Sequence, residues 1–123
     1  MKNKLIYLAI PYSYDPETSY KIANEVAAEL MQDGYIVFSP ISHSHSISCY
    51  MKEELIFNYD FWMKQDLPLL RKCDEVWFIL IGDDGWKKLD ESKGCVRELK
   101  ESKLLKIKRR YYHYDTKRVF ELP

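Results

Sequence analysis

The feature that most constrains the fold is the alternation of short apolar runs with helical patterns along the chain. The runs are almost continuously apolar, as in strands that are covered on both faces. They are residues 4–10, 35–38 and 75–81, with a fourth that begins at 104–107. Between the first two, apolar residues recur at helical spacing from Ala23 to Met31, which predicts an amphipathic helix that ends at Gly34. A strand, a helix and a second strand in this order predict a right-handed parallel crossover.

We therefore expect an α/β fold, a three-layer sandwich around a parallel, flavodoxin-like sheet. The expected strand order is 2-1-3-4, where residues 111–114 would extend the fourth strand and residues 118–122 would form a possible fifth. In this order the first and third strands are neighbours. Ligands of such sheets bind beyond the carboxyl ends of the strands, where the winding reverses. This predicts a site at which the loop 11–15 faces the segment 82–98.

Length and composition fit one domain, residues 1–123, that is large enough to bury a core. No run approaches the roughly 18 apolar residues of a membrane span. The short apolar run near the N-terminus contains Tyr7 and ends at Pro11, so it reads as a strand rather than a signal peptide, and we expect a cytoplasmic protein. The 19 Lys and Arg residues balance 19 Asp and Glu residues, so no overall field would attract nucleic acid or a membrane.

The segment from Asp83 to Leu99 gives the strongest functional signal and reads as a loop followed by a helix. Asp90 or Ser92 can cap this helix. Gly94 would let a ligand approach the amides of the first turn, and Glu98 lies about one turn further on. This spacing places an anion site beside a carboxylate, whose charged form the helix dipole would favour. The alternative is a solvated helix in which the Glu only favours helix formation.

Residues 41–58 form a long excursion after the second strand, without a regular pattern beyond a possible short helix at 51–57. His43 and His45 in this excursion would contact a phosphate or a base, or else bond to the backbone. Their spacing, without a third ligand nearby, argues against zinc, so we expect no metal.

A helix is expected at residues 59–73, with Pro68 as a possible kink. Asp66 in this helix is flanked by apolar positions and is either a hydrogen-bonded structural acid or an acid of the site. Trp86 is either a core or interface aromatic or a lid over the site. The cysteines lack a CxxC pair, which favours reduced, buried thiols; they are Cys49, Cys73 and Cys95.

Basic and aromatic residues are interleaved between Lys103 and Tyr114. Such a pattern can bind single-stranded nucleic acid. Because the net charge is zero and the residues alternate, we favour a blunted edge strand or a contact between subunits, and expect no nucleic-acid partner.

Four short motifs, in their order and spacing, resemble the nucleoside 2-deoxyribosyltransferase-like family, which includes transferases and nucleotide N-glycosidases. Within that family the chain is especially similar to a small group from phages and bacteria. The motifs lie within residues 5–107 and are residues 6–12, residues 34–40 with His43-Ser44-His45, residues 73–77, and residues 92–98.

This resemblance implies roles for several side chains. Glu98, four residues after Gly94, would be the nucleophile that attacks the anomeric carbon of a deoxyribosyl group. Tyr7 would hold its hydroxyl near that carboxylate, and Tyr12 would stack on the base. Asp74 would protonate the departing base or position the sugar.

The transferases of the family usually have an Asp six residues before the nucleophile, whereas its monophosphate hydrolases have a Ser that contacts phosphate. This chain has Ser92 there, so the resemblance implies a nucleoside 5′-monophosphate as substrate. Its phosphate would be held by Ser92, Lys93 and the amides up to Gly94. Ser13 is a further expected contact, in a loop that lacks the Gly and Arg of some hydrolases.

The resemblance thus implies an N-glycosidase that cleaves the base–sugar bond of a (2′-deoxy)nucleoside 5′-monophosphate through a covalent glycosyl–Glu98 intermediate. The alternatives are a nucleoside 2-deoxyribosyltransferase and a non-catalytic nucleotide-binding module that serves in signalling. Neither a cofactor nor a metal is implied. Because the family completes its site across a subunit boundary, a homodimer or larger assembly is expected.

Overall fold

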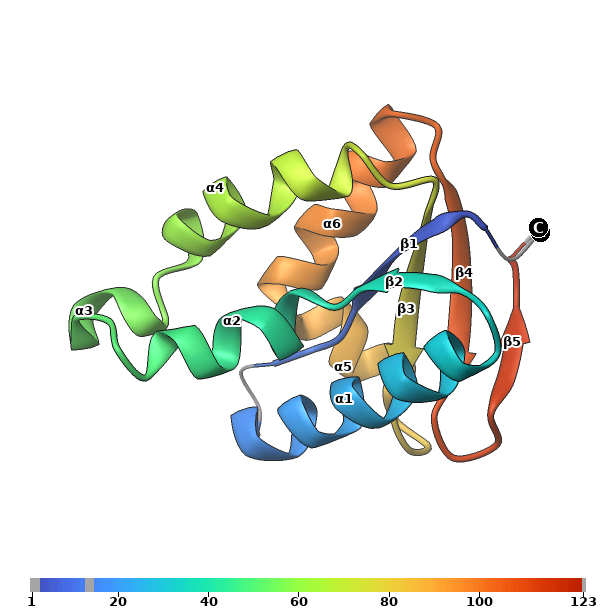
Figure 1. Cartoon of the computed structure of the whole chain (residues 1–123), viewed down its shortest axis with the longest axis horizontal. Coiled ribbons are helices and arrows are strands. Elements are labelled where there is room, and N and C mark those ends of the chain that lie inside the picture. Colours follow the sequence, from blue (N-terminus) through green and yellow to red (C-terminus); the bar gives the residue numbers. More distant parts are fainter. Residues whose placement is uncertain (1–2, 13–14, 123) are drawn as a thin grey trace.

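The computed structural model describes residues 3–12 and 15–122, in which one sheet lies between two layers of helices (Figure 1). The elements, in chain order, are β1 (Leu5–Ala9), α1 (Pro16–Gln32), β2 (Ile36–Phe38), α2 (Pro40–Ser48), α3 (Glu53–Ile56), α4 (Tyr59–Leu70), β3 (Glu75–Leu80), α5 (Gly85–Glu91), α6 (Lys93–Leu104), β4 (Lys108–His113) and β5 (Arg118–Phe120).

The strands lie in the order β2-β1-β3-β4-β5. β1 pairs in parallel with β2 and β3, and β3 pairs in parallel with β4, whereas β5 runs antiparallel to β4. The expected α/β class, the order 2-1-3-4 and the fifth strand are therefore confirmed. The winding reverses between β1 and β3, so the carboxyl end of β1 is where a ligand site is expected.

Each face of the sheet is packed against helices, because successive side chains of a strand point to opposite faces. In β1, Ile6 and Leu8 join the core beneath α1, while Tyr7 and Ala9 join the core beneath α4, α5 and α6. Because both faces of β1 are buried, residues 4–10 are almost continuously apolar in the sequence. The alternation also directs Tyr7 toward the α6 side of the sheet.

The excursion after β2 contains α2, which the sequence pattern did not reveal, and α3, which lies within the short helix expected at residues 51–57. Ser39 caps α2 by accepting a hydrogen bond from the Ser42 N–H at 3.4 Å, and Pro40 occupies the first turn. The buried face of α2 consists of Pro40, Ser44 and Ser48 rather than large apolar residues. A helix whose packed face is small and polar leaves no apolar periodicity to detect.

Three other boundaries differ from expectation. Ser92 separates two helices, α5 and α6, and α4 ends at Leu70 rather than at residue 73, with Pro68 inside it as expected. The run at 104–107 is the end of α6 and a turn, so β4 begins at Lys108. β4 lies inside the sheet with Tyr111 and Tyr112 buried, so the expected edge strand in this run is wrong.

Candidate active site

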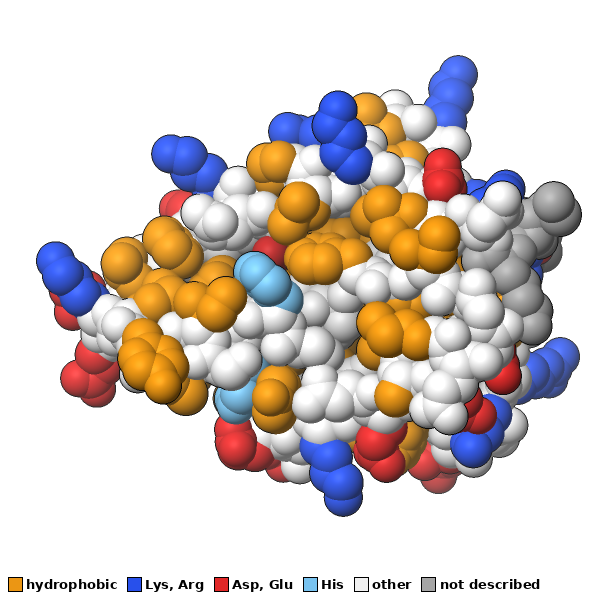
Figure 2. Space-filling view, in the orientation of Figure 1, with side chains coloured by type: hydrophobic (Ala, Val, Ile, Leu, Met, Phe, Trp, Pro, Cys, Tyr) orange, Lys and Arg blue, Asp and Glu red, His pale blue; other side chains and the backbone are white. Residues whose placement is uncertain are grey.

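A pocket of about 370 Å³ is lined by residues from the carboxyl end of β1, from α2 and α4, and from the N-terminus of α6. Figure 1 shows how these elements are arranged. Its volume falls in the range of pockets that bind small molecules. Figure 2 shows hydrophobic side chains gathered between α2 and α4 on this face. Three charged side chains among the described residues line the pocket, and these are Lys93, Asp66 and Glu98.

The pocket lies at the end of β1, as expected. The remaining residues that line it differ from the predicted segment 82–98. Residues 92–98 contribute, whereas residues 82–84 do not reach the lining. α2 and α4 contribute much of the remaining wall. The site is therefore built from the strand end and from residues of α2, α3, α4 and α6 rather than from two facing loops.

The N-terminus of α6 forms one end of the pocket. Ser92 is its cap, because the Ser92 hydroxyl accepts a hydrogen bond from the Cys95 N–H at 3.3 Å, whereas Asp90, the other predicted cap, lies within α5. Ser92, Lys93 and Gly94 all line the pocket. The first amides of a helix carry positive partial charge, so this end of the pocket suits an anion.

Lys93 is already engaged by an aromatic ring. Its Nζ lies 4.3 Å from the centroid of the Tyr59 ring, a cation–π distance. Tyr59 lines the same pocket, so this contact keeps an ammonium group at the anion-binding end.

Glu98 and Tyr7 form the best-defined polar contact of the site. The Tyr7 hydroxyl donates a hydrogen bond to Oε2 of Glu98, although the two residues are 91 positions apart in the chain. Tyr7 is fully buried and Glu98 is 6% exposed. The carboxyl group of Glu98 thus borders the pocket with one oxygen already satisfied.

Burial dominates the ionisation of Glu98. Burial, with a smaller contribution from the nearby Asp66 charge, raises the pKa of this carboxyl to about 8 against the opposing hydrogen bonds from Tyr7 and Cys95. The expectation that the helix dipole would favour the charged form is therefore wrong. The cost of removing the carboxylate from water exceeds the stabilisation from the helix end.

Asp66 is the second acid of the pocket. It is 7% exposed, and burial raises the pKa of its carboxyl to about 6. The sequence left its role open. The signal in the sequence was an Asp next to apolar positions of a helix, since a buried Asp is rare unless its carboxyl has a partner.

Tyr12 and His45 belong to a hydrogen-bonded cluster at the pocket wall. The Tyr12 hydroxyl lies 2.6 Å from His45 Nδ1, and His45 Nε2 lies 2.6 Å from an oxygen of Glu17. Tyr20 stacks on the His45 ring with centroids 4.2 Å apart. His45 is therefore held from α1 and from the end of β1, and both Tyr12 and His45 line the pocket.

Two of the candidate residues, Asp74 and His43, lie outside this site. Asp74 is exposed at the amino end of β3, where its carboxylate accepts a hydrogen bond from the Leu5 N–H at 2.9 Å, so its expected catalytic role is not supported. His43 is exposed and absent from the pocket lining, with its ring 5.8 Å from Phe38. Ser13 lies outside the described residues.

Trp86 does not act as a lid. Its ring packs near Tyr111 and Phe120, with centroid distances of 4.9 and 6.1 Å, and it does not line the pocket. Cys73 and Cys95 are free and buried as expected, whereas Cys49 is exposed.

Two negative findings apply to residues 3–12 and 15–122. These residues contain no helix that is both long and apolar enough to cross a membrane. Nor do three or more His, Cys, Asp or Glu side chains gather there as a metal site would require.

Solved structures with the same architecture are 2-deoxyribosyltransferases. The enzyme from Bacillus psychrosaccharolyticus matches with a TM-score of 0.60 and 20% identity, over 89% of this chain and 72% of that enzyme. The 2-deoxyribosyltransferase from Leishmania mexicana matches with a TM-score of 0.57 and 18% identity, over 89% of this chain and 64% of that enzyme. At these identities the likeness establishes the fold, which is the fold that the sequence motifs implied.

Comparison by sequence gives a family without an assigned activity. No curated protein matches the chain. A family model described as "Domain of unknown function (DUF1937)" matches residues 4–112, from the lysine before β1 to the fourth strand of the sheet. The chain therefore belongs to the DUF1937 family and has the fold of the 2-deoxyribosyltransferases.

Proposed function

We propose that this protein is an N-glycosidase that cleaves the base–sugar bond of a (2′-deoxy)nucleoside 5′-monophosphate through a covalent glycosyl–Glu98 intermediate. The observation that carries this proposal is the Glu98 carboxyl at the edge of an aromatic-lined pocket, fixed by the Tyr7 hydroxyl. Glycosidic cleavage by a carboxylate requires a positioned acid, a proton for the leaving group and a surface for the base. The pocket offers candidates for all three.

In the first step, an oxygen of ionised Glu98 attacks C1′ of the sugar. The bond between C1′ and the base nitrogen breaks, and its electron pair leaves with the base. A proton from Asp66 neutralises the departing base. Asp66 replaces Asp74 as the candidate acid because it lines the pocket and its pKa is raised to about 6.

In the second step, water attacks C1′ and displaces Glu98. The Asp66 carboxylate accepts a proton from that water, so both acids return to their starting states. Sugar 5-phosphate and free base are the products. Each acid thus has one task, as a nucleophile or as a proton carrier.

Because its pKa is raised, Glu98 must lose a proton before it can act as the nucleophile, and this loss costs free energy. Because the pKa of Glu98 lies near 8 and that of Asp66 near 6, the resting pair holds its proton on Glu98. Moving the proton to Asp66 creates the productive pair at a cost of about 3 kcal/mol. The positive charge that develops on the sugar would offset this cost, because it stabilises the Glu98 carboxylate.

The end of the pocket at α6 supports a phosphate on the substrate. The N–H groups of Lys93 and Gly94 belong to the first turn of α6, and the Lys93 ammonium lies beside them over Tyr59. A phosphate placed there would gain charge-assisted hydrogen bonds. Glu98 lies about one helical turn after Gly94 on α6, and Asp66 lies about two turns after Tyr59 on α4. This spacing leaves room for the sugar between the phosphate and the two acids.

The likeness to two solved 2-deoxyribosyltransferases favours a second candidate, transfer of the sugar to another base. The first step would be the same. In the second step a base nitrogen, rather than water, would attack C1′. Adding a second free base to the reaction distinguishes the two, because only a transferase forms a new nucleoside or nucleotide.

The test is release of free base from a panel of deoxynucleosides and their 5′-monophosphates, followed by chromatography. We expect release from one or more monophosphates, and a loss of at least about a thousandfold in kcat for Glu98→Ala. Mass spectrometry of the rapidly quenched protein should detect a sugar phosphate bound to the wild type and not to the variant. Binding of nucleotides without any release of base would instead favour a non-catalytic module.

A further inference from the structure

Phe57 is an exposed aromatic residue at the mouth of the pocket. It lies between α3 and α4, lines the pocket, and is 68% exposed. A large apolar side chain in water loses the free energy that burial would provide. Its ring lies beside that of Tyr12, with centroids 6.4 Å apart and planes inclined by 33°.

The two rings are in ordinary aromatic contact rather than already parted. Packed rings elsewhere in the molecule have similar centroid distances, 5.7 Å for Phe78 and Tyr111 and 5.8 Å for Tyr111 and Phe120. A base that stacks on Tyr12 would therefore displace the Phe57 ring, which would then cover the other face of the base.

The Tyr12 wall is fixed by its neighbours. Its hydroxyl is held by His45, which is itself held by Glu17 at 2.6 Å and stacked on Tyr20. The Tyr12 ring is therefore a preorganised surface, which reduces the entropy that a ligand must overcome on binding.

The Phe57 wall has a fixed backbone and a free side chain. Trp62 donates an indole hydrogen bond to the carbonyl of Ile56 at 2.7 Å, and Asn58 caps α4 by accepting from the Phe61 N–H at 2.9 Å. Both neighbours of Phe57 in the chain are thus anchored. Its ring can swing over a ligand without disturbing either helix.

We propose that Phe57 is the second wall of an aromatic clamp that, together with Tyr12, holds the flat base of the nucleotide. This inference rests on the proposed function, because it names the residue that would recognise the base in the same pocket. The clamp selects for a planar aromatic ring system and leaves the sugar and phosphate to the α6 end.

The experiment measures binding in a Glu98→Gln background, in which a bound nucleotide is not consumed. Isothermal titration with dCMP, dUMP and dAMP should show an affinity about 5- to 150-fold lower for Phe57→Ala. 2-Deoxyribose 5-phosphate, which has no base, should bind equally to both proteins. Phe57→Trp should restore nucleotide affinity, because the indole provides the same surface.

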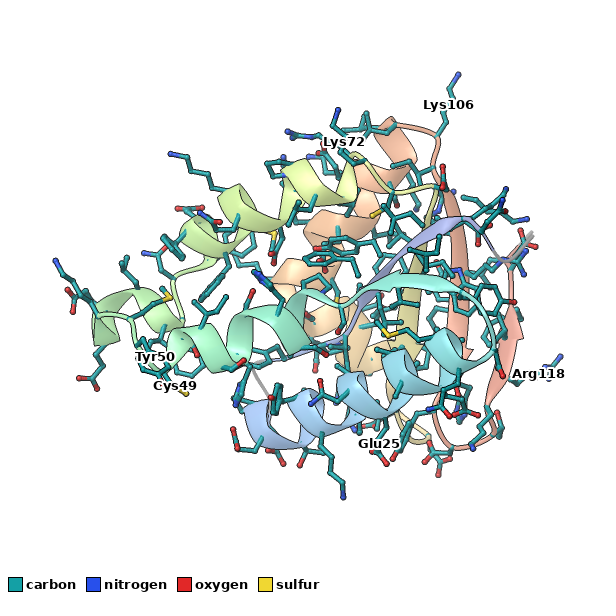
Figure 3. All side chains as sticks on the ribbon, viewed as in Figure 1. Glu25, Cys49, Tyr50, Lys72, Lys106 and Arg118 are labelled. Atoms are coloured by element: carbon teal, nitrogen blue, oxygen red, sulfur yellow. The ribbon has the colours of Figure 1, made fainter. Side chains whose placement is uncertain are left out.

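Tyr50→Ala is the matched control. Tyr50 lies just after α2, is 94% exposed and does not line the pocket (Figure 3). Its removal should leave nucleotide affinity unchanged. Equal nucleotide affinity with and without the Phe57 ring would overturn the clamp.

The outcomes separate the clamp from the reaction. If nucleotides bind and Phe57→Ala weakens them, but the wild type releases no base, the clamp stands and the N-glycosidase proposal fails. If the wild type releases base and Phe57→Ala leaves both affinity and KM unchanged, the reaction stands and the clamp fails. If no nucleotide binds at all, both fail.

Discussion

At the scale of single residues, Glu98 meets two opposing demands. Its carboxyl lies in a buried position at the pocket wall, where the proposed reaction with a sugar would take place, yet the same burial raises its pKa from 4.5 to about 8. At neutral pH the Glu98 carboxyl therefore keeps its proton in the folded protein, whereas in the unfolded chain it has already lost it. Stability and the proposed chemistry are in conflict at this one side chain.

The sign of this conflict predicts how stability depends on pH. Between pH 4.5 and about 8 the folded state binds the Glu98 proton and the unfolded state does not, so this residue destabilises the fold as pH rises. Above pH 8 the shifted pKa of Glu98 lowers the free energy of unfolding by about 5 kcal/mol, and below the pKa of the unfolded chain it has no effect on it. Glu98→Gln should therefore raise Tm strongly at pH 8.5 and hardly at pH 4.5, as measured by thermal unfolding.

Glu101→Gln is the control for this prediction, since Glu101 is also buried on α6. Its carboxylate is paired with Arg71 Nε at 2.7 Å and with Arg97 at 3.5 Å. Removing its charge should lower Tm, because the buried side chain loses charged partners. A Glu98→Gln protein that is less stable than the wild type at pH 8.5 would contradict the account of Glu98.

At the scale of elements, the start of α6 has two roles that one substitution can separate. Ser92 caps the helix, and it also stands at the end of the pocket that we assign to phosphate. Asp is as good a helix cap as Ser, but its negative charge repels phosphate. Function can therefore be changed here without loss of the cap.

We expect Ser92→Asp to reduce kcat/KM for nucleoside 5′-monophosphates by about 10- to 100-fold relative to the corresponding nucleosides. Base release from matched pairs, such as dCMP and deoxycytidine, measures this ratio. Thermal unfolding should show an unchanged Tm within a few degrees. An unchanged ratio in a well-folded variant would place the phosphate elsewhere.

The elements also show what the sequence could and could not predict. The strands and their parallel order followed from apolar runs that are buried on both faces, and Glu98, Ser92 and Gly94 followed from a motif with fixed spacing. α2 was missed because its packed face is built from Ser44 and Ser48, which carry no apolar signal.

The choice between Asp74 and Asp66 could not be made from spacing alone. Both residues come before β3 in the chain. Asp74 lies at the amino end of β3, away from the pocket, whereas Asp66 lies on α4 and lines the pocket. Only the packing of α4 against α6 decides which acid approaches Glu98. Phe57 carried no sequence signal at all, since an aromatic residue between helices is usually structural.

At the scale of the whole molecule, the outer surface of α6 bears on assembly. Val96 is 46% exposed and Leu104 is 69% exposed, and the two residues lie eight positions apart on α6, about 80° from each other around the helix axis. Exposed apolar side chains that gather on a surface are typical of contacts between subunits. From these two residues and the family resemblance, we propose a homodimer or larger assembly.

Sedimentation velocity over a range of protein concentrations tests this proposal. We expect a dimer or larger species at micromolar concentration, and monomers for the double variant Val96→Glu, Leu104→Glu. Tyr50→Glu, on the distant turn after α2, should not change the sedimentation coefficient. A wild-type protein that sediments as a monomer at the highest concentrations would refute the assembly.

The Tyr7–Glu98 hydrogen bond joins the first strand to the last long helix, across 91 positions of the chain. During synthesis Tyr7 leaves the ribosome early, and Glu98, which accepts its hydrogen bond, follows only after most of the polypeptide has been made. If the proposed function holds, a nascent or truncated chain that lacks α6 would lack its nucleophile and could not cleave a nucleotide. Two separately expressed fragments, divided before α6, would restore the Tyr7–Glu98 hydrogen bond only by associating, and base release would then report their reassembly.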